Sequence, residues 1–349
     1  MVNEKKDLEP IEETEKESLA DNVRTLSPSA LVLKRFFRSK LSVVGLVTLI
    51  VLFVFSFFGP LFQGLPFIWG EQEIDSSTGK TAIREDEIKY TVDGEEYFAY
   101  DVMVDQYSYN ILGAPSSTHL LGTDSKGYDV FSRLMYGGRI SLTIGFVVVI
   151  LETLIGVLLG GIAGYFGKWV DQLIMRIVDV FNCIPTLPMM LIISFILDSL
   201  GVEPITKLYS MMALLTLIGW AGTARLVRGQ ILSLREQEFM IAAEATGLTP
   251  WRKIFRHLLP NVMPQLIVTM TLGLGGIILT EATLGYLGLG LPSNYATWGN
   301  IITAAANFEY LQNYANIWVP AGICIVLAVL AFNFIGDGLR DAFDPKMKR

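Results

Sequence analysis

The stretch Arg225–Asn261, RLVRGQILSLREQEFMIAAEATGLTPWRKIFRHLLPN, decides how the rest of this chain is interpreted. It is polar and lies between two apolar runs, 208–227 and 262–290, each long enough to cross a bilayer, which takes roughly 20 helical residues. A membrane protein that keeps two short amphipathic helices in one such loop presents them to a soluble partner. The stretch therefore predicts a membrane protein that works together with another protein.

The composition indicates the same class. The chain is 52% hydrophobic and only 17% charged, and it has 32 glycines, which is too apolar for a soluble domain of 349 residues. Because every backbone N–H and C=O must be paired within lipid, long apolar runs become helices, and these runs lack the alternation of a β-barrel. We expect an all-α polytopic membrane protein with six transmembrane helices, at 41–59, 140–165, 174–199, 208–227, 262–290 and 316–336.

Basic residues beside the spans indicate the orientation, because cytoplasmic loops are enriched in Lys and Arg. They precede the first span, follow the second, fill the loop after the fourth and recur in the tail, whereas 289–316 contains none. Both termini and the loop 225–261 are therefore predicted to be cytoplasmic.

The segments outside the spans divide the chain further. Residues 1–30 mix acidic and basic side chains and are expected to be a disordered cytoplasmic N-terminus without a removable signal peptide. Residues 60–138 hold 13 Asp and Glu against 5 Lys and Arg and are expected to be an extracellular acidic insert followed by an amphipathic segment. Within it, Ile88–Val92 and Tyr97–Tyr100 flank Asp93-Gly94, a pattern typical of a β-hairpin, so that we expect a small β-containing insert.

The remaining boundaries follow from the spans. We expect 31–59 to form the first transmembrane helix, 139–336 a core of five further transmembrane helices with a cytoplasmic loop at 229–261, and 337–349 a cytoplasmic tail.

No pattern in the chain indicates a metal, a nucleotide or a catalytic residue. Cys183 and Cys324 fall within spans and are expected to be buried hydrophobic residues, while His119 and His257 are predicted to lie on opposite sides of the membrane. Gly79-Lys80-Thr81 lacks the glycine that a phosphate-binding loop needs five positions earlier.

The polar loop contains signals for two short helices. Glu236–Thr246 has no Gly or Pro, and Gly247 is placed as its C-terminal cap. Its residues Phe239, Ala242, Ala243 and Thr246 share one face, which has nothing bulky at its alanines and which a second protein can approach closely.

Thr249 and Pro250 then predict the start of a second helix. We expect an apolar stripe of Trp251, Ile254, Phe255, Leu258 and Leu259 to pack on the spans or the membrane surface, opposite a polar face of Arg252, Lys253, Arg256 and His257. The alternative interpretation is a loop that merely packs on itself.

This loop resembles the "EAA" loop of permease subunits of ABC importers, in which E-A-A is followed by three residues, G, nine residues and I-x-L-P. The departures are Ile241, where the pattern has Glu, and His257, where it has Ile. Glu238 and Glu244, one turn away on either side, are placed to supply the charge. The resemblance implies that the residues coupling this chain to an ATPase are Glu238, Phe239, Ala242, Ala243, Glu244, Thr246, Gly247 and Pro260.

Further segments resemble the C-type permeases of dipeptide and oligopeptide importers. They are His119–Arg139, Arg176–Asp179 with Pro185, Glu281–Gly290 with Trp298–Asn300, and Asn333–Pro345. The resemblance covers about 30–60 and 115–349, whereas the acidic insert 60–114 does not belong to the pattern.

The resemblance implies a subunit that moves di- and oligopeptides across the bacterial cytoplasmic membrane. Its implied partners are a homologous B-type permease, two cytoplasmic ATPase subunits, an extracellular peptide-binding protein and membrane lipid, with no nucleic acid. ATP and Mg then belong to the ATPases, and this chain is no enzyme and needs no cofactor. Nickel complexes and glycosides are alternative cargoes for the same architecture.

Several residues within the spans have two interpretations. Glu152 and Glu281 are candidates for lining the translocation path, because a charge in an apolar run faces a cavity or a partner. Their alternative role is a hydrogen bond between packed helices. Arg176 and Asp179 are expected to form a structural ion pair or an interface contact, and Pro185 to kink the third span.

Two other classes of protein explain the sequence less well. An ion-coupled secondary transporter leaves the partner-facing loop unexplained and usually has paired repeats, which are not seen here; transport without ATPase partners would identify it. A membrane-anchored enzyme would need its active residues in 60–138, where there is one His, no Cys and no nucleophile arrangement. Activity of an isolated 60–138 fragment would identify that class.

Overall fold

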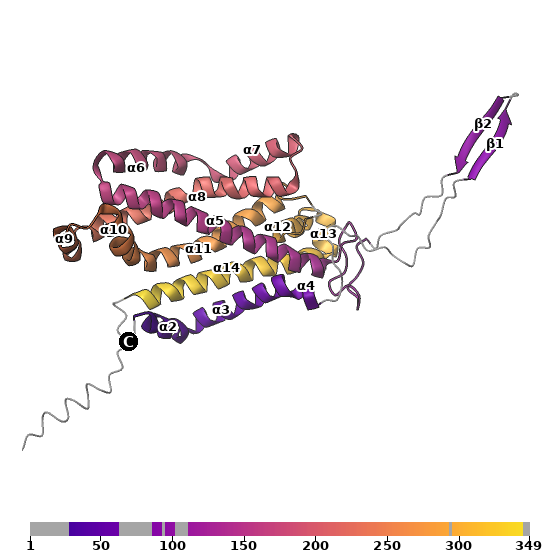
Figure 1. The fold of residues 1–349 in the computed structure, drawn as a ribbon. Coiled ribbons are helices and arrows are strands. Elements are labelled where there is room, and N and C mark those ends of the chain that lie inside the picture. Colours follow the sequence, from indigo (N-terminus) through magenta and orange to yellow (C-terminus); the bar gives the residue numbers. More distant parts are fainter. Residues whose placement is uncertain (1–27, 63–85, 93–94, 102–110, 293–294, 345–349) are drawn as a thin grey trace, which may run out of the picture.

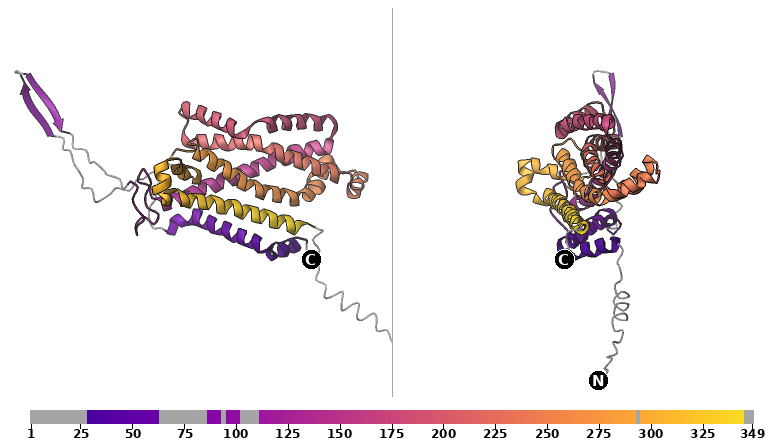
Figure 2. Two further views of the ribbon diagram at one scale, coloured as in Figure 1. Left: turned by 180° about the vertical axis from the view of Figure 1, so that it is seen from behind. Right: turned by 90° about the vertical axis from the view of Figure 1, so that its left-hand side faces the viewer.

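The computed structural model describes residues 28–62, 86–92, 95–101, 111–292 and 295–344. Apart from one hairpin, its regular elements are helices, and the long ones run lengthwise through one bundle (Figures 1 and 2). Among the described residues, five helices are long and apolar enough to cross a membrane, and a bent pair makes six if it counts as one span. The predicted all-α polytopic architecture is confirmed.

The first predicted span forms an uninterrupted but irregular helix. It consists of α3 (Lys40–Phe53), the π-helical segment η1 (Val54–Phe58) and α4 (Gly59–Phe62), and it follows the amphipathic helix α2 (Pro28–Arg38).

The second span is part of α5 (Val130–Phe166), which begins well before the apolar run. Asp129 is its N-cap, and the Asp129 carboxylate accepts a backbone N–H at 2.6 Å. The polar side chains of the first turns are satisfied by other parts of the chain: Arg139 donates to the carbonyls of Ser56 and Phe57 at 2.8 and 2.6 Å. The cap and these contacts extend the helix into a region that sequence alone assigns to the preceding insert.

The third predicted span, 174–199, is broken in the structure. α6 (Lys168–Cys183) and α7 (Thr186–Ser199) are bent by 73° at Ile184 and Pro185. Proline disfavours the helical conformation of the residue before it, and Ile184 is extended, with ψ 119°. The predicted kink at Pro185 is therefore confirmed, and it is sharp enough to divide the span into two helices.

The rest of the chain continues with one long helix, a set of short helices and two more long helices. These elements are α8 (Pro204–Leu234), α9 (Glu238–Ala245), α10 (Pro250–Lys253), η2 (Ile254–Leu258), α11 (Leu259–Tyr286), α12 (Trp298–Ile302), η3 (Thr303–Ala306), α13 (Phe308–Asn313) and α14 (Ala315–Phe343).

Helix α5 lies at the centre of the packing and contacts α8 and α11, while α14 lies between α11 and α3 (Figure 1). The α5–α8 contact brings two backbones together: a Cβ placed on Gly160 would lie 2.4 Å from the carbonyl oxygen of Ala224. The largest core cluster joins α5, α11, α12 and α14 and includes the fully buried Trp298 and Phe332.

The predicted hairpin region contains two paired strands. β1 (Asp86–Val92) and β2 (Glu95–Asp101) are antiparallel, with Ile88 opposite Ala99 and Tyr90 opposite Tyr97. The strands include both predicted runs. The expected turn at Asp93-Gly94, the N-terminal residues 1–27 and the last residues 345–349 lie outside the described residues.

Candidate functional site

The two ends of the bundle carry different elements. α2, α9, α10 and the C-terminal end of α14 lie at one end, and α4, α12 and α13 lie at the other (Figures 1 and 2). The segments that the charge pattern assigns to one side of the membrane are thus gathered at one end, which we call the α9 end.

Helix α9 has one buried side and one side exposed on the protein surface. Met240 and Ala243 are buried, with Ala243 only 7% exposed, and Met240 packs in the cluster that contains Ile231, Ile254 and Leu258. The side chains that α9 and its C-cap leave exposed are Glu238, Phe239, Ile241, Ala242, Glu244, Ala245 and Thr246. The expectation that Ala243 shares the open face is therefore wrong, because this alanine packs on the chain's own core.

The end of α9 has the predicted geometry. Gly247 has φ +70°, its N–H donates to the carbonyl of Glu244 at 2.9 Å, and the N–H of Leu248 donates to that of Ala243 at 3.4 Å. A left-handed residue stops the helix here, and glycine adopts this conformation without a side-chain clash. Thr249 is the N-cap of α10 as expected, although its side chain makes no capping hydrogen bond.

The second short helix differs from the expected apolar stripe. Ile254 and Leu258 are buried, but Trp251 and Phe255 are half exposed and stack on one another with ring centroids 6.0 Å apart. Lys253, expected on the polar face, is 6% exposed, with its Nζ 3.4 Å from Oε1 of Glu244. The segment that follows, Ile254–Leu258, is π-helical.

Glu281 is held by hydrogen bonds within the chain. Ser141 Oγ donates to Glu281 Oε2 at 2.8 Å and accepts the N–H of Trp298 at 3.2 Å, while Trp298 Nε1 donates to the carbonyl of Leu134 at 3.0 Å. These bonds join α11, α5 and α12, and the adjacent cavity is only about 40 Å³. The geometry of Glu281 favours the helix-packing interpretation over a role in the path.

Glu152 has a different environment. It lines a cavity of about 220 Å³ between α5, α8 and α11, together with the hydroxyl-bearing side chains Thr153, Thr223 and Thr269. Gly219 makes room for the carboxylate, since a Cβ there would collide with Glu152 Oε1. Within the described part of the chain, no hydrogen-bond or ion-pair partner of this carboxylate is found.

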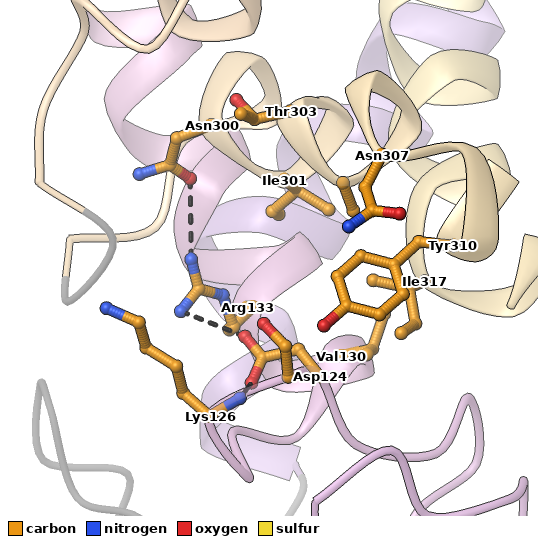
Figure 3. A pocket seen from close by; sticks show the side chains of 12 residues that line it. Asp124, Lys126, Val130, Arg133, Asn300, Ile301, Thr303, Asn307, Tyr310 and Ile317 are labelled. Atoms are coloured by element: carbon orange, nitrogen blue, oxygen red, sulfur yellow. Dashed lines mark hydrogen bonds and ion pairs between the residues drawn. The ribbon is translucent and has the colours of Figure 1, made fainter.

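The sequence did not predict which residues gather around either carboxylate, nor a pocket of about 240 Å³ at the opposite end of the bundle from α9. In that pocket the buried Arg133 lies 3.3 Å from Asp124 and donates to Asn300 at 3.4 Å, as the dashed lines in Figure 3 show. The two partners come from distant parts of the chain. Arg133 is thus already neutralised, and it ties the segment before α5 to α12.

Two further expectations need correction. Asp179 pairs with Arg225 at 2.7 Å rather than with Arg176. Cys324 is buried as expected, but Cys183 is exposed, because it ends α6 at the break before α7.

Comparison with known proteins gives consistent likenesses over most of the chain. Residues 156–349 match the family described as binding-protein-dependent transport system inner membrane component, and residues 27–72 match the N-terminal TM domain of oligopeptide transport permease C.

Three relatives illustrate the extent of the likeness. The oligopeptide transport system permease protein OppC of Bacillus subtilis (strain 168) is 35% identical over 90% of this chain and 88% of the relative. The dipeptide transport system permease protein DppC of the same organism is 34% identical over 96% and 92%. A putative peptide permease protein of Brucella suis biovar 1 (strain 1330) is 42% identical over 67% and 75%.

Proposed function

Since this chain belongs to the binding-protein-dependent transport system inner membrane component family, we propose that it is the C-type permease subunit of an ABC importer of di- and oligopeptides. It pairs with a homologous B-type permease, and ATP hydrolysis on two cytoplasmic ATPase subunits drives it. A peptide-binding protein delivers the cargo from outside. The relatives named as oligopeptide and dipeptide permeases support this class of cargo.

The observation that carries this proposal is the construction of the α9 end. Helix α9 is anchored through Met240, which lies in the same cluster as Ile231 near the end of α8, and Ala243 is buried as well. The rest of the helix surface, with Phe239, Ile241 and Ala242, is the open face. A helix built this way receives a contact from outside and passes any displacement to α8, which is what an ATPase-coupling helix must do.

The orientation follows from the same arrangement. We place the α9 end in the cytoplasm, because it carries the basic segments before the first span, after the second and between the fourth and fifth, and cytoplasmic loops are enriched in Lys and Arg. Both termini are then cytoplasmic, the hairpin of β1 and β2 is extracellular, and the pocket around Arg133 faces the side on which the binding protein arrives.

We assign the translocation path to the Glu152 cavity. An ionisable side chain within a span faces a cavity or a partner, and Glu152 meets that condition while the hydrogen-bonded Glu281 has a structural role.

The test is an affinity pulldown of the detergent-solubilised chain, with an ATPase assay of the eluate. We compare wild type with Ala242→Arg on the open face of α9 and with Ala306→Arg, at an alanine that is also exposed, in η3 at the opposite end. Wild type and Ala306→Arg are expected to bring down a second permease and the ATPases, whereas Ala242→Arg keeps the permease and loses the ATPases. Full retention of the ATPases by Ala242→Arg would contradict the coupling role of α9.

The cargo is tested separately by uptake of labelled tripeptides into proteoliposomes that contain the complete complex. ATP-dependent uptake that requires the binding protein is the expected result. Uptake without ATPase subunits would identify an ion-coupled transporter instead. If nickel complexes or glycosides are taken up and peptides are not, these solutes are the cargo.

A further inference from the structure

We propose that the Glu152 cavity is a subsite for cations, and that it receives the ammonium group of the passing cargo. This inference rests on the proposed function, because it assumes that the cargo is a peptide that crosses through this cavity. It assigns a chemical role to Glu152 and to the three threonines around it.

The depth of the cavity is the first observation. Gly219 lies at the midpoint of α8, and Gly273 lies at the middle of α11, and both line the cavity. Glu152 is 14 residues from the end of α5 at Phe166, or about 21 Å at 1.5 Å per residue. All three helices thus contribute their central parts, so the cavity lies midway between the two ends of the bundle.

The absence of an internal counter-charge is the second observation. In the described part of α8, the basic side chains have acidic partners: Lys207 pairs with Asp198, while Arg225 and Arg228 pair with residues of α6. None of these pairs reaches Glu152. A carboxylate in an apolar span without a cation of its own is stabilised when a cation arrives.

The lining of the cavity is the third observation. Besides Glu152 and apolar residues it is lined by Thr153, Thr223 and Thr269, whose hydroxyl oxygens are hydrogen-bond acceptors, and by no basic side chain. An ammonium group donates three hydrogen bonds and carries a positive charge, so this lining complements it in both respects. The cavity has a volume of about 220 Å³, whereas pockets that enclose whole ligands have roughly 300 Å³ or more. It is therefore large enough for one end of the peptide only.

Two groups of a peptide have this chemistry, the α-ammonium and a lysine side chain. A third source of positive charge is a basic residue of the second permease, which would make Glu152 an assembly contact instead. The experiment separates these three sources.

The complete complex is reconstituted with wild type, Glu152→Gln or the control Glu309→Gln, which makes the same chemical change at an exposed position of α13. Uptake is measured for a neutral tripeptide with a free amine, its N-acetylated form, and an N-acetylated form with one lysine. Mass spectrometry first establishes that each peptide loads onto the binding protein, which is kept saturating so that its selectivity does not enter the comparison.

We expect Glu152→Gln to lower uptake of ammonium-bearing peptides by about tenfold, the size of one lost charge-assisted hydrogen bond, and to leave the neutral acetylated peptide unchanged. A loss confined to the free-amine peptide identifies the α-ammonium, and a loss confined to the lysine peptide identifies the side chain.

Three results would overturn the inference: equal slowing of all three peptides, no slowing of any, or loss of the second permease from the purified Glu152→Gln complex. The last result would assign the carboxylate to assembly. If wild type moves none of the peptides, the proposed function fails together with the inference, and that failure is visible without any variant.

Discussion

The close contact between α5 and α8 predicts opposite effects on stability for alanine at two neighbouring glycines of α5. Gly160 and Gly161 are both buried, and both lie within α5. A Cβ on Gly160 would lie 2.4, 2.9 and 3.0 Å from three backbone atoms of Ala224. A Cβ on Gly161 would meet only side-chain atoms of Ile231 and Ile254, at 3.8 and 3.9 Å.

The magnitudes follow from these distances. Alanine at position 160 must move the helices apart by about 1 Å to restore van der Waals contact, and overpacking of this kind costs about 1–3 kcal/mol. Because the clash is with backbone, no rotamer change relieves it, so we take the upper value. The gain of about 1 kcal/mol for replacing glycine within a helix offsets part of it. Gly160→Ala is then destabilised by about 2 kcal/mol, and Gly161→Ala is stabilised by about 1 kcal/mol.

The assay is thermal unfolding of each variant in detergent, followed by size-exclusion chromatography of heated samples. A difference of about 3 kcal/mol between the variants corresponds to a difference in Tm of about 4 °C in a chain of this size. If Gly160→Ala melts at or above the temperature of Gly161→Ala, the close backbone approach of α5 and α8 is refuted.

Three further substitutions test other parts of the structure. Gly247→Ala forces alanine into a left-handed conformation, φ +70°, and should weaken the end of α9 by about 1 kcal/mol, measured as faster amide hydrogen exchange there. Trp298→Phe removes the 3.0 Å bond to Leu134 and side-chain volume from a fully buried site, and should lower the free energy of unfolding by about 2 kcal/mol; an unchanged Tm would contradict this burial. Arg228→Lys replaces a bidentate contact with Asp171, at 2.9 and 2.5 Å, by a single one and should lower stability by about 1 kcal/mol or less, a loss that 1 M salt should reduce.

The sequence predicts the spans well, because the length of an apolar run is a local property that lipid converts directly into helix. The cap at Gly247 and the break at Pro185 are also local, since each depends on the backbone preference of one residue. The start of α5 could not be placed in this way. It depends on the carbonyls of Ser56 and Phe57, which belong to another helix and satisfy Arg139.

The candidate sites depend more on tertiary contacts. The spacing in α9 places Ala242 and Ala243 on one broad face, and only the fold, in which Met240 packs against Ile254 and Leu258, shows that Ala243 is buried. Likewise, Glu152 and Glu281 are equivalent in sequence as lone acids in apolar runs. Their difference arises from residues far away in the chain, such as the serine that donates to Glu281.

The length and continuity of helix α8 have a mechanical consequence. Its 31 residues run without a break from the Lys207–Asp198 pair to the short link before α9, a length of about 46 Å at 1.5 Å per residue. Such a rod acts as a lever, so that a tilt of about 10° carries its far end through an arc of about 8 Å. The neighbouring pair α6–α7, bent by 73°, has a joint where α8 has none. If α9 receives the ATPase contact as proposed, α8 carries that displacement as one rigid body, whereas the joint at Pro185 lets α6 and α7 change their mutual angle.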